Sequence, residues 1–85
     1  MENASNSMKV RIFDLEHGLK EYDEVTYIRI VSGDYNLLIM QDYMPIMGEI
    51  NGSVSINGKD VSLDLNDINA YYIHRDNEFN LMIKG

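Results

Sequence analysis

The dipeptide Asn57-Gly58 lies between two stretches in which apolar and polar residues alternate, residues 53–56 and residues 60–65. Alternation with a period of two is typical of a strand that buries one face. Asparagine followed by glycine favours the positive φ angles of a two-residue type I′ turn, which joins antiparallel strands. The sequence therefore predicts a β-hairpin that turns at Asn57-Gly58.

The same strand signal recurs along most of the chain. β-Branched and aromatic residues are frequent, and clusters of glycine, asparagine and aspartate separate the runs. Further strands are expected at residues 8–13, 24–31, 36–40, 71–74 and 79–83. Residues 15–24 are expected to form a loop and a short strand. The pattern predicts an all-β fold of about eight to ten short strands, arranged as a small two-sheet β-sandwich or a flattened barrel.

Pro45 lies inside an apolar, methionine-rich stretch that runs from Ser32 to Ile56. Proline has no backbone N–H, so it interrupts a helix and removes a hydrogen bond from a central strand. Residues 44–50 are therefore expected to form an edge strand or the beginning of a strand. No part of the chain approaches the roughly 20 apolar residues that a membrane-spanning helix needs, and no insertion into a membrane is expected.

The composition limits the possible partners. The 85 residues include 14 acidic and 7 basic side chains, a net charge of −7, and the basic residues are scattered singly. Binding to phosphate backbones needs clustered positive charge, so no nucleic-acid partner is expected. The absence of cysteine excludes disulfides and thiolate catalysis, and it is compatible with a reducing compartment.

The chain is long enough for one domain. Residues 1–7 are polar and lack the basic and apolar segments of a secretory signal, so they are predicted to be a disordered tail. Residues 8–85 then form a single β domain of modest stability. We expect a cytoplasmic protein.

No residues with catalytic or metal-binding spacing stand out. His17 and His74 lie far apart in the sequence, without a nucleophile or a second ligand beside either, and each is expected to be a surface or partly packed histidine. No glycine-rich loop is present that could hold phosphate groups. The residues thus predict a binding or structural module that is not an enzyme and takes no cofactor, metal ion or small-molecule ligand.

The order of residues in the apolar stretch points to a family. The run DYNLLIMQDYMPIM at 34–47, followed by Ile50, Gly52 and Ile56, resembles the signature of the epsilon subunit of F-type ATP synthases. In that family a Gly-Glu turn leads into Leu-Gly-Ile-Leu, a Pro-Gly-His-Ala-Pro loop, two apolar residues, and a glycine shortly before an isoleucine. The resemblance covers about residues 8–84, through spacing more than identity.

The chain departs from the family signature at several positions. Of the Pro-Gly-His-Ala-Pro loop only the last proline is present, as Pro45, and QDYM at 41–44 replaces the rest. Asn36 stands where the family has an acidic residue, and Leu38 where it has a glycine. This protein would be a divergent member.

The resemblance implies a ten-stranded sandwich that links the gamma shaft of a rotary motor to its c-ring. Tyr43, Met44, Pro45 and Met47 are then the expected contacts with the gamma-type shaft, and Asn36 is the expected contact with the c-ring. The protein would be a non-catalytic central-stalk subunit that couples rotation to ion transport. It would be peripheral to the inner face of the membrane.

Two alternatives remain open at this point. Methionines such as Met40, Met44 and Met47 often fill irregular gaps in a core, although a loop position favours an interface for Met44. The whole chain could also be a stand-alone β-sandwich adaptor or ligand-binding domain, unrelated to ATP synthase. The resembled family usually has a C-terminal helical hairpin that restrains ATP hydrolysis. No such hairpin is expected here, because the sequence ends directly after the last expected strand.

Overall fold

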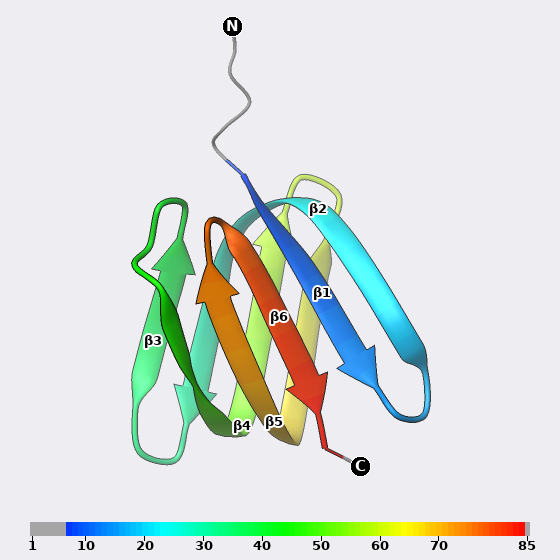
Figure 1. The fold of residues 1–85 in the computed structure, drawn as a ribbon. Coiled ribbons are helices and arrows are strands. Elements are labelled where there is room, and N and C mark those ends of the chain that lie inside the picture. The colour runs from blue at the N-terminus through cyan, green and yellow to red at the C-terminus, as the bar shows by residue number, and fades with distance from the viewer. Residues whose placement is uncertain (1–6, 85) are drawn as a thin grey trace, which may run out of the picture.

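The computed structural model describes residues 7–84, in which all regular structure is β-strand. The strands are β1 (Met8–Asp14), β2 (Gly18–Ser32), β3 (Asn36–Met40), β4 (Ile46–Gly58), β5 (Ser62–Arg75) and β6 (Glu78–Ile83) (Figure 1). The all-β prediction is confirmed, but the described chain has six strands, so the predicted number of eight to ten is wrong. Most of the predicted tail at residues 1–7 lies outside the described residues.

Five of the strands close into a barrel. Their order is β1-β6-β5-β4-β2, β1 pairs again with β2, and β3 adds one more strand beside β2. All neighbouring strands are antiparallel except β1 and β6, which run parallel. The prediction of a barrel is therefore confirmed. The alternative prediction, a two-sheet sandwich, is not shown, because the strands form one continuous hydrogen-bonded sheet.

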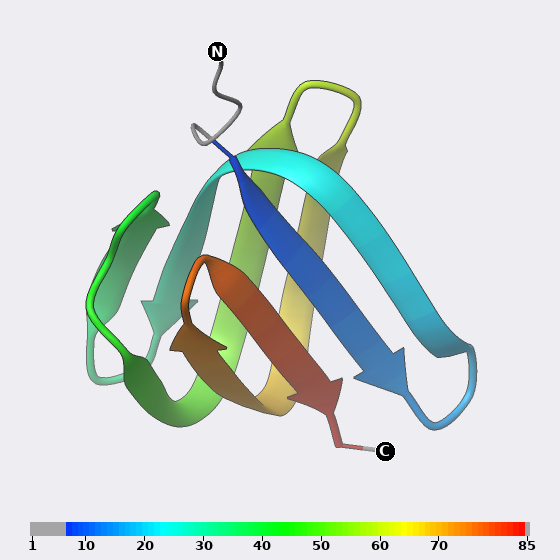
Figure 2. The same ribbon diagram turned by 45° about the horizontal axis from the view of Figure 1, so that its top comes forward.

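The strand number is low because three strands are long and bent. β2, β4 and β5 contain 15, 13 and 14 residues, and each runs along one side of the barrel before it turns onto another (Figures 1 and 2). Between β4 and β5 the register shifts, so that Asn66 and Asp67 lie opposite Ser53 alone. Such a β-bulge bends a strand. Asp67 has a φ of 54°, and Glu24 in β2 has a φ of 56°.

Gly52 permits the close approach of β4 to β2 near this bend. A Cβ atom at Gly52 would run into the carbonyl oxygen of Val31 and lie 3.1 Å from the Cα of Ser32. The backbones of the two strands therefore meet without room for a side chain. At Gly33, in contrast, an added Cβ would have no neighbour within 4 Å.

The hairpin predicted at Asn57-Gly58 exists, but its turn lies two residues later. Asn57 pairs with Ser62, and the Gly58 N–H donates to the Val61 carbonyl oxygen at 2.8 Å, which leaves Lys59-Asp60 as the turn. Gly58 does not have a positive φ. A Cβ there would instead run into the carbonyl oxygen of Glu24 on β2, so packing between strands requires this glycine.

The turn between β5 and β6 has the geometry that was predicted for the other hairpin. Asp76 and Asn77 have φ angles of 52° and 60°, and Arg75 pairs with Glu78. Two consecutive positive φ angles are the mark of a type I′ turn. The predicted polar connection at residues 75–78 is thus confirmed. The segment 15–24, in contrast, forms a turn and the start of the longest strand, in place of a short strand.

The inward positions of the strands form one hydrophobic core. Pro45 directly precedes β4, and residues 46–51 pair only with β5, which confirms an entering strand with one open edge. Ile39 on β3 is buried, whereas its neighbour Met40 is exposed. The buried apolar side chains are Met8, Val10, Ile12, Val25, Ile28, Ile30, Ile39, Ile50, Val54, Ile56, Ala70, Tyr72, Phe79 and Leu81.

We expect Gly52→Ala to lower the free energy of unfolding by about 1 to 3 kcal/mol, the usual cost of forcing atoms into filled space. Gly33→Ala is the matched control, because its methyl group enters open space, and we expect a change within about 0.5 kcal/mol. Urea unfolding followed by circular dichroism measures both. If both variants lose the same free energy of unfolding, the close contact between β4 and β2 is not the reason that glycine is needed at position 52.

Candidate functional site

A continuous row of exposed apolar side chains crosses the outer face of the barrel. Two of these side chains lie on one face of β5, and each of the others lies on a strand of its own. All of them are 39 to 71% exposed. We call this row the apolar belt. Its members are Met47 on β4, Tyr71 and Ile73 on β5, Met82 on β6, Phe13 on β1 and Leu19 on β2.

The strand register makes the belt continuous. Residues directly opposite each other on neighbouring strands share a face and lie in contact range. The opposed pairs are Met47 with Ile73, Tyr71 with Met82, Met82 with Phe13, and Phe13 with Leu19. Tyr71 and Ile73 are two residues apart on one strand and so also share a face. Figure 1 shows β5, β6 and β1, which carry the middle of the belt, side by side.

The sequence contains a signal for this belt. A strand that buries one face needs an apolar residue only at every second position. Residues 71–73, 81–83 and 12–13 are instead runs of consecutive apolar residues. Since Tyr72 and Leu81 point into the core, their neighbours along the strand are left on the outer face.

Ion pairs border the belt. The Lys84 Nζ lies 2.7 Å from the Glu49 Oε2 and 4.5 Å from the centre of the Tyr71 ring. The hydrogen bond to Glu49 raises the pKa of Lys84 above its ordinary value. On the other side, the Arg11 Nε lies 2.9 Å from the Glu21 Oε2. An apolar centre with a polar rim is the usual anatomy of a protein–protein interface.

Three of the residues predicted to contact a shaft lie at one end of the belt. Met47 is 71% exposed and is itself a belt member, and Met44 is 66% exposed in the loop before β4. Pro45 is exposed beside them, and a shallow hollow lined in part by Pro45, Met47 and Ile73 connects the loop to the belt. Met40 is also exposed, so the core alternative for these methionines is wrong.

Tyr43 and Asn36 are placed differently. Tyr43 is half-buried and packs against the core, with its ring centre 6.5 Å from that of His74. The loop around it is held by the backbone N–H of Asp42, which donates to the Asn77 Oδ1 at 2.6 Å. Asn36 is exposed at the start of β3 opposite Val31, away from the belt strands.

The two histidines have contrasting surroundings. His74 is fully buried and neither ring nitrogen has a hydrogen-bond partner, so the expectation of a surface or partly packed residue is wrong here. Burial lowers the pKa of His74 because the charged form loses its hydration. His17 is exposed, and its Nδ1 lies 2.8 Å from the Asp14 Oδ2, a contact that lowers the pKa of Asp14.

Residues 7–84 contain no group of three or more histidine, cysteine, aspartate or glutamate side chains placed to hold a metal ion. In the same range, no helix is long and apolar enough to cross a membrane.

Comparison with solved structures finds this fold in a chain from the central stalk and c-ring of the mitochondrial ATP synthase of Tetrahymena thermophila. The TM-score is 0.74 at 19% sequence identity, and the match covers 92% of this chain and 63% of that one. Comparisons with models of known protein families and with curated proteins give no match. The shared feature is therefore the fold, over somewhat less than two thirds of the solved chain.

We expect the stability of the protein to fall as the pH drops below about 6.5, the ordinary pKa of histidine. The unfolded chain then binds a proton at His74, whereas the buried imidazole in the folded chain resists protonation, so unfolding becomes more favourable. Above that pH both states are neutral at this residue, and its contribution is constant. The measurement is the urea midpoint between pH 7.5 and pH 5.

The variant His74→Leu should flatten this pH dependence, and His17→Leu, at an exposed position, should retain it. A wild-type slope in His74→Leu would contradict the assignment to His74.

Proposed function

We propose that the protein is a non-catalytic subunit of the central stalk of a rotary F-type ATP synthase. In this role the apolar belt, together with Met44 and Pro45, binds a gamma-type shaft. The observation that carries the proposal is an exposed apolar belt on a fold also found in a stalk and c-ring assembly. Because the sequence identity is low, the similarity of fold does not identify a binding surface. The binding role is therefore argued from the belt.

The chemistry of the belt suits a large and elongated partner. Monomeric proteins rarely leave a continuous apolar surface of several side chains in water, and such surfaces usually mark interaction sites. Met47 and Met82 can adapt their shape to a partner, and Tyr71 offers a broad ring with a polar tip. Fully burying a methionine or a similar side chain contributes about 1.5 to 3 kcal/mol, and several such side chains together offset part of the cost of association.

A linking subunit needs two separate binding surfaces. The belt lies on the strands from β4 to β2 through β5, β6 and β1, whereas Asn36 lies on β3, which pairs only with β2. We propose that β3 and Asn36 face the c-ring while the belt holds the shaft. The subunit then transmits rotation by attachment alone and is peripheral to the inner face of the membrane. It needs no active site or cofactor of its own.

We expect a tagged copy of the protein, purified from its native cells in mild detergent, to bring with it a gamma-type subunit and catalytic subunits of a rotary ATPase. Mass spectrometry identifies them. Purification that returns none of these subunits would contradict the stalk role and favour a stand-alone β domain.

We expect Met47→Ser to weaken binding to the gamma-type subunit on the order of tenfold, which corresponds to about 1.4 kcal/mol. Met40→Ser is the matched control, because Met40 is 50% exposed but lies on β3, outside the belt. Both variants should keep their thermal stability, since both positions are exposed. Ile39→Ala, at a buried position, should instead lose about 2 to 5 kcal/mol of stability. If Met47→Ser and Met40→Ser weaken binding equally, the belt is not part of the interface with the gamma-type subunit.

A further inference from the structure

Besides β3 and residues 46–51 of β4, two stretches of strand in the described chain have a backbone edge without a partner strand, and these two border the same opening. Residues 62–68 of β5 pair with β4 on one side only, because β6 begins to pair with β5 at Ala70. Residues 18–22 of β2 pair only with β1. The two edges do not pair with each other. They leave the side of the barrel open between them.

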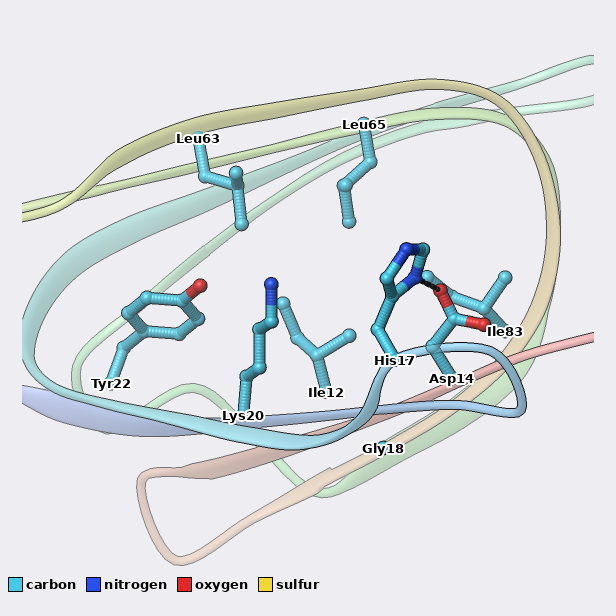
Figure 3. A pocket seen from close by; sticks show the side chains of 9 residues that line it. All are labelled: Ile12, Asp14, His17, Gly18, Lys20, Tyr22, Leu63, Leu65 and Ile83. Carbon is cyan, nitrogen blue, oxygen red and sulfur yellow. Dashed lines mark hydrogen bonds and ion pairs between the residues drawn. The ribbon is translucent and has the colours of Figure 1, made fainter.

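A cleft of about 240 Å³ occupies this opening, lined mostly by apolar side chains together with Asp14, His17 and Lys20. Leu63 and Leu65 of β5 line one side of it, and Ile12 and Tyr22 line the other (Figure 3). Ile12 is part of the core, whereas Leu63, Leu65 and Tyr22 pack against the core and remain partly exposed. The cleft therefore offers apolar contacts directly beside a strand edge that has free hydrogen-bonding groups.

The edges differ in how they are protected. Lys20 lies opposite Ile12 and points into the cleft from β2 (Figure 3). An inward-pointing lysine is a common device that keeps other strands from adding to an edge. β3, at the end of the strand order, is only five residues long, and the Tyr35 hydroxyl ties its start to the Glu49 carbonyl oxygen at 2.6 Å. The β5 edge carries Leu63 and Leu65 at its inward positions and no inward-pointing charge, and its β-bulge lies toward one end, at Asn66 and Asp67.

Charge indicates the kind of segment that fits the β5 edge. Asp64 and Asp67 are exposed along it and Asp60 is exposed in the turn before it, and none of the three forms an ion pair within residues 7–84. The whole chain has a net charge of −7. A basic segment gains from these carboxylates, whereas an acidic one is repelled.

We propose that residues 62–68 of β5 bind an extended basic segment of another protein by strand addition. The backbone of the segment pairs with the free edge, about 4.8 Å from β5. Alternate apolar side chains enter the cleft against Leu63 and Leu65, and the intervening lysines or arginines face Asp64 and Asp67. This inference rests on the free edge and the cleft, and it is independent of the belt and of the stalk role.

The probe is the peptide acetyl-Lys-Val-Lys-Ile-Lys-Val-Lys-amide, added to the complete protein. We expect saturable binding that weakens with salt, and slower amide hydrogen exchange at those residues of 62–68 whose N–H groups do not bond to β4. Residues 70–74, which already pair with both β4 and β6, should not change. Absence of binding, or protection confined to another edge, would overturn the proposal.

Two variants separate insertion from simple charge attraction. Leu65→Lys and Asn66→Lys add the same charge to neighbouring positions, but only Leu65→Lys points into the cleft and protects the edge. We expect Leu65→Lys to weaken peptide binding on the order of tenfold and Asn66→Lys to have a much smaller effect. Equal effects would overturn strand addition. Circular dichroism verifies folding, and if Leu65→Lys does not fold, the exchange pattern of the unmodified protein decides.

A second copy of the chain is the competing occupant. Sedimentation of the protein alone, with hydrogen exchange at low and high concentration, tests it. A dimer that protects residues 62–68 would overturn the proposal in favour of self-association. Met47→Ser lies on the belt and should bind the peptide normally, so a failure of the stalk proposal and a failure of this one are distinguishable.

Discussion

The close approach of β4 to β2 is the constraint on which the rest of the structure depends. Gly52 and Gly58 meet backbone atoms of β2 where no Cβ would fit, and Glu24 and Asp67 take positive φ angles at the bends of β2 and β5. Because these long strands bend, each serves two sides of the barrel, and few connections are needed to close it. The same bending separates the outer belt from the cleft on the open side.

The strand pattern was enough to predict an all-β fold, either a two-sheet sandwich or a flattened barrel, but not how its strands join. Alternation along residues 53–56 and 60–65 predicts a hairpin correctly, because each strand buries one face. The bends are hidden, since Glu24 adopts a conformation that favours glycine, asparagine or aspartate, and one aspartate such as Asp67 does not by itself mark a bend. The turn at Asn57-Gly58 was misplaced for a related reason: Gly58 is needed for contact with β2, which a local pattern does not reveal.

The candidate site was predictable in part for similar reasons. The loop position of Met44 and Pro45 indicated exposure, and their neighbour Met47 is exposed as well. The belt was missed because alternation identifies the residues that point inward. It gives no information about apolar residues that lie on the outer face. The burial of Tyr43 and His74 depends on how the loop before β4 folds back onto the turn after β5. That contact between distant segments leaves no mark in the local sequence.

The parallel pairing of β1 and β6 has a mechanical consequence. The ladder runs from Lys9 opposite Glu78 to Asp14 opposite Ile83, and the start of β1 and the end of β6 lie at opposite ends of it (Figure 1). A force applied between those two points pulls the strands past each other in shear. All hydrogen bonds of the ladder then carry the load together, instead of opening one after another. The barrel is therefore built to resist stretching along this direction more strongly than its modest size suggests.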